Sequence, residues 1–178
     1  LITDVGSTKT DIHKEILRQE LTDCFVGGHP MAGSEKTGYE NATDHLLENA
    51  YYIVTPPEGF NQNGCGYGNI SPKYSENVKR IIAVAQTVGA IPLVLDYKEH
   101  DTVVAAISHL PHLVASSLVN LVKDSDSPAE TMKQVAAGGF KDITRIASSS
   151  PEMWEQICMT NSEPIADMLE RYIDSLQD

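Results

Sequence analysis

The pattern of hydrophobic residues changes near residue 96, and this change most limits the folds that the chain can adopt. Before it, short apolar runs typical of strands alternate with segments of helical period, the pattern of a parallel α/β sheet. Strands are predicted at residues 1–5, 24–27, 51–55 and 91–95. Helices are predicted at residues 9–18, capped by Ser7 or Thr8, and after Ser71-Pro72, where Val78, Ile81, Ile82 and Ala85 recur at helical spacing.

Beyond residue 96 every periodic segment is helical, which predicts a second, all-α domain. A continuous apolar stripe marks a helix of about 25 residues and consists of Val103, Ile107, Leu110, Val114, Leu118 and Leu121. Ser127-Pro128, with a capping box to Glu130, and Ser150-Pro151 indicate two helix starts. A last amphipathic helix carries Ile165, Met168, Leu169, Tyr172, Ile173 and Leu176. Because a helical domain this small is marginal alone, we expect a homodimer.

Composition excludes several classes of protein. The chain has 13 Lys and Arg against 25 Asp and Glu, a formal charge of −12, so nucleic acid and anionic membranes are not expected partners. No apolar run approaches the roughly 20 residues of a membrane span. Cys24, Cys65 and Cys158 form neither a disulfide framework nor a zinc motif, which indicates the cytoplasm.

Since Leu1 already lies in a strand pattern, we expect that the N-terminal part of a longer protein is missing.

Two glycine-rich segments resemble nucleotide loops only loosely. Gly64-Cys65-Gly66-Tyr67-Gly68 lacks the GxGxxG spacing and lies well after the strand ending at Thr55, which favours a surface loop. In Gly6-Ser7-Thr8-Lys9 the lysine follows the hydroxyls instead of preceding them, so a kinase-type phosphate loop is not predicted.

Side chains suited to chemistry follow the first two predicted strands. Ser7 follows the first strand and His29 the second, and open α/β sheets bind ligands where their strands end. A histidine held between glycines and Pro30 suits a general base, because its ordinary pKa lies near neutrality. The alternatives are a helix cap for Ser7 and a loop histidine that only caps backbone groups.

The helical half offers two further groups. His109 and His112 are expected away from the apolar stripe, near Ser116, with a helix kink at Pro111. A metal site there needs another ligand that the spacing does not supply, so no metal is predicted. Lys141 and Arg145 lie one helical turn apart and form either a carboxylate clamp or a surface pair with Asp142.

Five segments together resemble the prephenate dehydrogenase family, which includes arogenate dehydrogenases. They are residues 4–9, 29–38, 49–56, 108–112 and 138–147. The resemblance implies a partial Rossmann-like α/β nucleotide-binding domain at residues 1–96 and a helical substrate-binding and dimerisation domain at residues 97–178. The family's opening GxGxxG turn, which cradles the cofactor pyrophosphate, is missing from this chain.

The resemblance also implies an activity, namely NAD-dependent oxidative decarboxylation of prephenate in tyrosine biosynthesis, with substrate between the two domains. His29 would accept the hydroxyl proton, and Ser7 would hydrogen-bond near the hydroxyl and the nicotinamide and help to orient His29. Arg145 would hold a substrate carboxylate. His109, Lys141, Thr144, Glu35 and Trp154 would line the substrate pocket, with Glu35 pairing with Arg145 and Trp154 reaching in from the partner subunit. Val5, Ser7 and Pro30 would contact the cofactor. An inactive fragment, an arogenate dehydrogenase and a non-catalytic dimerisation or ligand-binding module remain alternatives.

Overall fold

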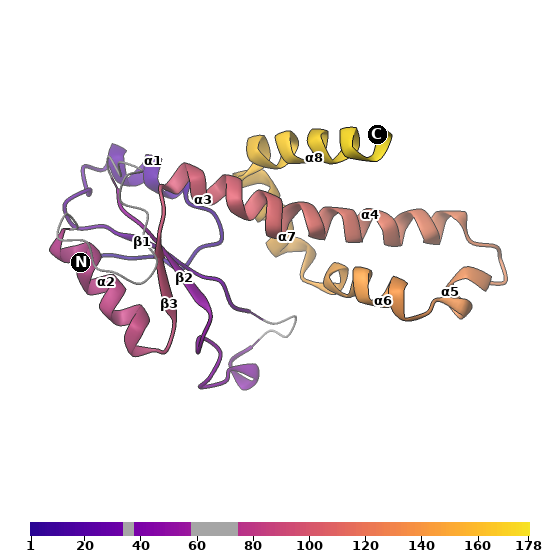
Figure 1. The fold of residues 1–178 in the computed structure, drawn as a ribbon, viewed down its shortest axis with the longest axis horizontal. Helices are drawn as coiled ribbons and strands as arrows, with labels where there is room; N and C mark the ends of the chain where they lie inside the picture. Colours follow the sequence, from indigo (N-terminus) through magenta and orange to yellow (C-terminus); the bar gives the residue numbers. More distant parts are fainter. Residues whose placement is uncertain (34–37, 58–74) are drawn as a thin grey trace. The chain divides into compact units, whose positions relative to one another are not determined.

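A computed structural model describes residues 1–33, 38–57 and 75–178, which form two compact units (Figure 1). The first unit comprises residues 1–103 and the second residues 104–178. The border predicted from the sequence, between residues 96 and 97, lies at the start of a long helix that runs across this division. The loop predicted at residues 64–68, the Ser71-Pro72 helix start and Glu35 lie outside the described residues.

The first unit combines a small mixed sheet with helices, as the α/β pattern predicts. Its elements are α1 (Thr10–Arg18), β1 (Gly27–Pro30), η1 (Tyr39–Asn41), β2 (Tyr51–Thr55), α2 (Glu76–Thr87), β3 (Ile91–Val94) and α3 (Tyr97–Val104). The strand order is β1-β2-β3, with β2 parallel to β3 and β1 antiparallel to β2. The expectation of a wholly parallel sheet is therefore wrong. An antiparallel neighbour needs no crossover helix, and the described residues between β1 and β2 contain no α-helix.

The strand predicted at residues 1–5 is reduced to one bridge between Ile2 and Phe25. Pairing stops because the Gly28 N–H donates to the side chain of Asp4 at 3.1 Å instead of to a backbone carbonyl of this segment. The next strand, predicted at residues 24–27, is assigned at Gly27–Pro30 and so includes His29, which was expected in the following loop.

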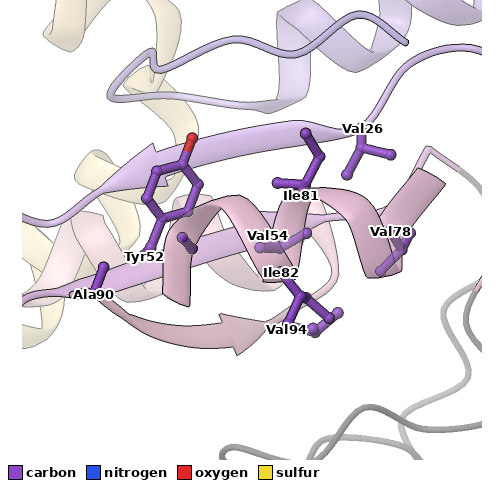
Figure 2. Packing of buried hydrophobic residues seen from close by; sticks show 9 residues of the cluster. Val26, Tyr52, Val54, Val78, Ile81, Ile82, Ala90 and Val94 are labelled. Carbon is purple, nitrogen blue, oxygen red and sulfur yellow. The ribbon is translucent and has the colours of Figure 1, made fainter. Parts of the chain in front are cut away.

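The core of the first unit lies between α2 and the sheet (Figure 2). Ser75 begins α2 by accepting a hydrogen bond from the Val78 N–H at 3.3 Å, and the predicted apolar face is buried. This confirms the helix that the sequence predicts there. The cluster consists of Val26, Tyr52, Val54, Val78, Ile81, Ile82, Ala85, Ala90 and Val94.

The second unit is entirely helical in the structure, as predicted. Its elements are η3 (Ala105–His109), α4 (Leu110–Ser125), α5 (Thr131–Val135), α6 (Gly138–Thr144), η4 (Arg145–Ser148), α7 (Pro151–Thr160) and α8 (Ser162–Gln177). Ser150 caps α7 by accepting from the Met153 N–H at 3.4 Å, which confirms that helix start.

The capping box predicted at Ser127 and Glu130 is wrong. Glu130 has a left-handed backbone with φ of 51°, and α5 begins only at Thr131. Asp126 instead accepts hydrogen bonds from the N–H groups of Ser127, Met132 and Lys133 at 2.8, 2.9 and 3.0 Å. One carboxylate therefore satisfies the exposed amides at this helix start.

Residues Tyr97–Ser125 form one continuous helix of 29 residues, in which η3 is a π-helical segment just before Pro111. By length and composition alone this helix could cross a membrane, contrary to the expectation that no segment is apolar over such a length. Helices that pack only against protein share these properties.

The face of this helix that packs within the chain is not the predicted apolar stripe. Val104, Ala105, His109, His112 and Ala115 are buried, whereas Ile107 and Leu121 of the stripe are each 62% exposed. The two histidines lie away from the stripe, as expected, but that side of the helix is the buried one. Trp154 in α7 and Asn161, which directly follows α7, supply aromatic and amide partners for them.

Candidate active site

Three polar side chains of the first unit form a continuous chain of hydrogen bonds. His29 Nδ1 lies 2.8 Å from His100 Nε2, and His100 Nδ1 lies 2.8 Å from Asp101 Oδ1. His29 comes from β1, whereas His100 and Asp101 come from the first turns of α3. His100 and Asp101 are 0% and 1% exposed, and His29 is only half-buried. The chain therefore runs from a buried carboxylate towards a partly accessible imidazole.

This arrangement fixes which imidazole nitrogens carry protons. An ionised carboxylate only accepts hydrogen bonds, so His100 donates to Asp101 through Nδ1–H. The other nitrogen of neutral His100, Nε2, is then an acceptor and receives the Nδ1–H of His29. Neutral His29 consequently has its proton on Nδ1 and a lone pair on Nε2. That is the tautomer that a general base on this ring requires.

Asp101 is held in its ionised form by several donors. Burial by itself raises the pKa of this carboxyl, but hydrogen bonds from His100, Thr10 and Lys9 outweigh burial and leave the pKa below its ordinary value. The N–H groups of Lys9 and Thr10 donate to Oδ1 and Oδ2 at 2.8 and 2.7 Å. Asp101 thereby caps α1, a role expected of Ser7 or Thr8, whereas the residue at the N-cap position is Lys9. That expectation is wrong because a residue distant in sequence takes the position.

The segment that contains Ser7 is tied to β1 by Asp4. The Gly6 N–H donates to Asp4 Oδ2 at 2.8 Å, and the Gly28 N–H donates to Asp4 Oδ1 at 3.1 Å. Ser7 and His29 are thus each one residue beyond an amide held by the same carboxylate. Among the described residues Ser7 makes no hydrogen bond to His29, whose orientation is set by His100. The predicted role of Ser7 stays a prediction.

The two glycines before His29 are required by close packing. A Cβ on Gly27 would lie 2.2 Å from Thr55 Oγ1, and one on Gly28 would lie 2.7 Å from both the Asp4 carbonyl oxygen and the Tyr52 hydroxyl. Real side chains do not approach so closely, so any larger residue would displace β1 and His29. Of the residues predicted to contact cofactor, Val5 is 66% exposed and Pro30 is half-buried opposite Tyr52 in the sheet.

A second group of polar and aromatic side chains lies within the helical unit. His112 stacks on Trp154 with ring centroids 3.6 Å apart, and His109 meets the same indole edge-on at 6.0 Å. His109 Nδ1 also lies 3.0 Å from the Asn161 side-chain nitrogen, and burial lowers the pKa of His112. Trp154 contacts these histidines from its own chain. Its predicted contribution across a dimer stays a prediction.

The predicted cations lie on the surface of the helical unit. Lys141 in α6 and Arg145 at the start of η4 are exposed, and the hydroxyl of Thr144 donates to the Phe140 carbonyl at 2.7 Å. In residues 1–33, 38–57 and 75–178, no three His, Cys, Asp or Glu side chains are grouped so that they could hold a metal ion.

Sequence reasoning missed His100, Asp101, Asp4 and Asn161 as members of these groups. A signal for the first two exists, because a His-Asp pair follows the last strand closely and starts a helix, where ligand sites of α/β sheets gather. Asp4 was noted only as part of a motif. Nothing in the pattern around Asn161 marks it.

Two family profiles match the chain. The profile described as the nucleotide-binding domain of prephenate dehydrogenase matches residues 1–64, and the one described as its dimerization domain matches residues 96–178. The prephenate dehydrogenase of Bacillus subtilis is 42% identical over 176 residues, covering 97% of this chain and 43% of the relative. The chain thus spans less than half the length of this relative and of the prephenate dehydrogenase of Lactococcus lactis, which it also matches.

Solved structures show the same fold. The prephenate dehydrogenase of Aquifex aeolicus in complex with hydroxyphenyl propionate and NAD+ is 35% identical, with a TM-score of 0.81, covering 98% of this chain and 56% of that one. The arogenate dehydrogenase of Synechocystis is 27% identical, with a TM-score of 0.77, covering 99% and 59%.

Proposed function

Because the chain belongs to the prephenate dehydrogenase family, we propose that it carries the substrate side of an NAD-dependent oxidoreductase that converts prephenate to 4-hydroxyphenylpyruvate. In this reaction the carbon bearing the ring hydroxyl loses a hydride, the hydroxyl gives its proton to a base, and the ring carboxylate leaves as carbon dioxide. The phenolate oxygen so formed then takes a proton back. The ring becomes aromatic, which drives the step. The protein must supply a base at the hydroxyl and cations at the carboxylates.

The observation that carries this proposal is the hydrogen-bonded chain from Asp101 through His100 to His29. It presents a lone pair on His29 Nε2 for the substrate hydroxyl proton. Once His29 is protonated, its Nδ1–H remains bonded to His100, and the buried Asp101 carboxylate stabilises the positive charge through His100. Asp101 and His100 therefore orient the base and stabilise its protonated form.

The residues present suit the nicotinamide end of NAD. Val5 offers an exposed apolar side chain and Ser7 a half-buried hydroxyl, on the segment that Asp4 ties to β1 beside His29. NAD, when bound, supplies the hydride acceptor. The Aquifex aeolicus relative was solved with NAD+, which supports this choice of cofactor.

Recognition of the substrate carboxylates falls to cations of the helical unit. Arg145 is the donor proposed for bidentate binding of a carboxylate, with Lys141 one turn away and Thr144 between them. His109 and Trp154, which contact each other edge-on, are proposed to line the pocket that takes the ring. Glu35 is proposed to pair with Arg145.

We also propose that the protein acts as a homodimer in the cytoplasm. Residues 96–178 match a dimerization domain, and the stripe with Ile107 and Leu121 is left exposed within one chain. Along α8, Ile165 is buried whereas Ile173 and Leu176 are 45% and 68% exposed. A second copy of the chain covering these faces would remove their apolar side chains from water, which would explain why apolar residues occur at exposed positions.

Arogenate is the second candidate substrate, because the Synechocystis relative is an arogenate dehydrogenase. Arogenate carries an amino acid side chain where prephenate carries a keto acid. Parallel assays with the two compounds separate the candidates.

The test is isothermal titration of the chain with prephenate, with and without NAD, together with an absorbance assay for NADH. We expect saturable binding of prephenate, and either binding alone or binding with NADH formation supports the proposal. Absence of both binding and NADH formation would contradict it. Binding of arogenate but not prephenate would replace the substrate.

A further inference from the structure

Lys9 is a fully buried cation whose ammonium the proposed chemistry does not use. Its side chain is 0% exposed, and its Nζ forms an ion pair with Oδ2 of Asp4, which is 20% exposed. Burial lowers the pKa of Lys9, and the hydrogen bond and charge of Asp4 oppose that shift. Removing an ammonium from water costs several kcal/mol, so replacing such a pair by apolar residues is often neutral or stabilising. Overall stability therefore does not explain why a charged pair lies here.

The position of the pair indicates another role. Oδ2 of Asp4 accepts hydrogen bonds from both the Gly6 N–H and Lys9 Nζ. One carboxylate oxygen therefore links the residues on either side of Ser7. Oδ1 of the same carboxylate accepts from the Gly28 N–H, next to His29. Lys9 is itself held in place, because its backbone N–H donates to Asp101 Oδ1 at 2.8 Å.

We propose that Asp4 and Lys9 are positioning residues that fix the segment containing Ser7 against His29. The Ser7 hydroxyl and the His29 imidazole can then both contact the hydroxyl of the substrate. This inference rests on the proposed function of Ser7 and His29. The α1 N-terminus is then joined to His29 by two routes, one through Asp4 and Gly28 and the other through Asp101 and His100. A base and a hydrogen-bonding hydroxyl held in this way need no reorganisation when substrate binds.

The discriminating variant removes both charges, Asp4→Asn with Lys9→Met, because neither then leaves an unpaired buried charge. We expect this double variant to fold and its Kd for prephenate to differ from that of the unaltered chain by less than about threefold. The amide signals of Ser7 and the imidazole signals of His29 should shift in NMR spectra, and the rate of NADH formation should fall on the order of a hundredfold, as expected for misplaced reacting groups. Lys14→Met is the matched control, since Lys14 pairs with Asp11 on the same helix while 68% exposed.

The outcomes separate this inference from the proposed function. Unchanged Ser7 and His29 signals, or an unchanged rate, in the folded double variant would overturn the positioning role. Equal losses of thermal stability, affinity and rate would indicate a purely structural pair and would also overturn it. If the unaltered chain neither binds prephenate nor forms NADH, the proposed function fails. Whenever the unaltered chain forms no NADH, with or without prephenate binding, the NMR signals alone decide whether the pair holds Ser7 against His29. If the double variant does not fold, Lys9→Met alone carries the same measurements, because Asp4 is 20% exposed and its carboxylate still accepts from the Gly6 and Gly28 N–H groups.

Discussion

His29 Nδ1 lies 2.8 Å from His100 Nε2, a contact between a strand residue and a helix residue 71 positions later in the chain. When both imidazoles are neutral, one proton lies between His29 Nδ1 and His100 Nε2. Asp101 determines that His29 carries this proton, because its carboxylate accepts a hydrogen bond from Nδ1 of His100 and so leaves Nε2 of His100 as an acceptor. The proton-accepting capacity of His29 is therefore set by a residue that does not touch it.

Replacing Asp101 by Asn tests this relay. The asparagine amide can donate to His100 Nδ1, which would turn His100 Nε2 into a donor and leave His29 protonated on Nε2. We expect the rate of NADH formation from prephenate to fall on the order of a thousandfold, by comparison with the serine protease triad, with prephenate affinity nearly unchanged. Asp11→Asn, an exposed substitution in α1, is the control. An equal loss of affinity and rate would contradict the relay.

His29→Ala and Arg145→Ala are expected to affect different kinetic constants. Loss of the base should lower turnover much more than substrate affinity, whereas loss of the guanidinium should mainly weaken binding, by roughly tenfold to a hundredfold. Steady-state kinetics combined with titration calorimetry separate the two. If both variants changed affinity alone, the roles assigned here to His29 and Arg145 would be wrong.

Acid should destabilise the first unit through His13. This residue is 0% exposed, bonded to Thr55 Oγ1 at 2.9 Å and stacked on Tyr97 with ring centroids 4.4 Å apart. Burial, followed by the nearby Lys9 charge, lowers its pKa from 6.5 to about 4, against the opposing charges of Asp4, Asp101 and Asp96. Between these pH values the unfolded chain binds more protons than the folded one. The free energy of unfolding therefore falls as pH drops from about 6.5 to about 4, by about 3 kcal/mol.

The measurement is hydrogen exchange of β2 amides as a function of pH, since the chain's one tryptophan, Trp154, reports on the helical unit instead. His13→Gln retains a donor near Thr55 without titrating, and it should flatten the profile between these pH values. His45→Gln is the control, because the side chain of His45 is 71% exposed. A His13→Gln profile as steep as that of the unaltered chain would rule out this cause.

Leu121→Glu should weaken self-association. Leu121 is 62% exposed on the stripe proposed to meet a second copy, and a carboxylate there would lose its hydration on association. Analytical ultracentrifugation should show the dimer dissociating at concentrations where the unaltered chain remains dimeric. Val84→Glu, at a residue 56% exposed on α2, provides a matched change on the other unit. A Leu121→Glu chain that remains as dimeric as the unaltered one would exclude this face.

Local patterns predicted those elements whose stabilising contacts are also local. The spacing of Val78, Ile81 and Ile82 predicts α2 correctly, and Ser150 before Pro151 predicts the start of α7. In both, the capping group lies within a turn of the amide that it satisfies. The change from strands to helices near residue 96 likewise follows from periodicity, and it predicts the two kinds of architecture that the structure contains.

Long-range pairing accounts for most of what the sequence did not predict. Asp101 caps α1 from 91 and 92 residues away, so Ser7 and Thr8 were assigned a role that another residue holds. The antiparallel pairing of β1 accompanies a connection whose described residues contain no crossover helix, which strand propensities do not report. The inward orientation of His109 and His112 depends on Trp154 and Asn161, which lie far along the chain. Periodicity identified the apolar stripe but not whether it packs within one chain.

The central claim is that Asp101 and His100 hold His29 as a base, and the tautomer of His29 tests it most directly. In the ¹⁵N NMR spectrum of the chain above neutral pH, we predict that His29 and His100 both carry their proton on Nδ1, with Nε2 of His29 unprotonated. Asp101→Asn should move the His29 proton to Nε2. A neutral His29 protonated on Nε2 in the unaltered chain would contradict the account, because the ring would then offer the substrate hydroxyl a donor instead of a base.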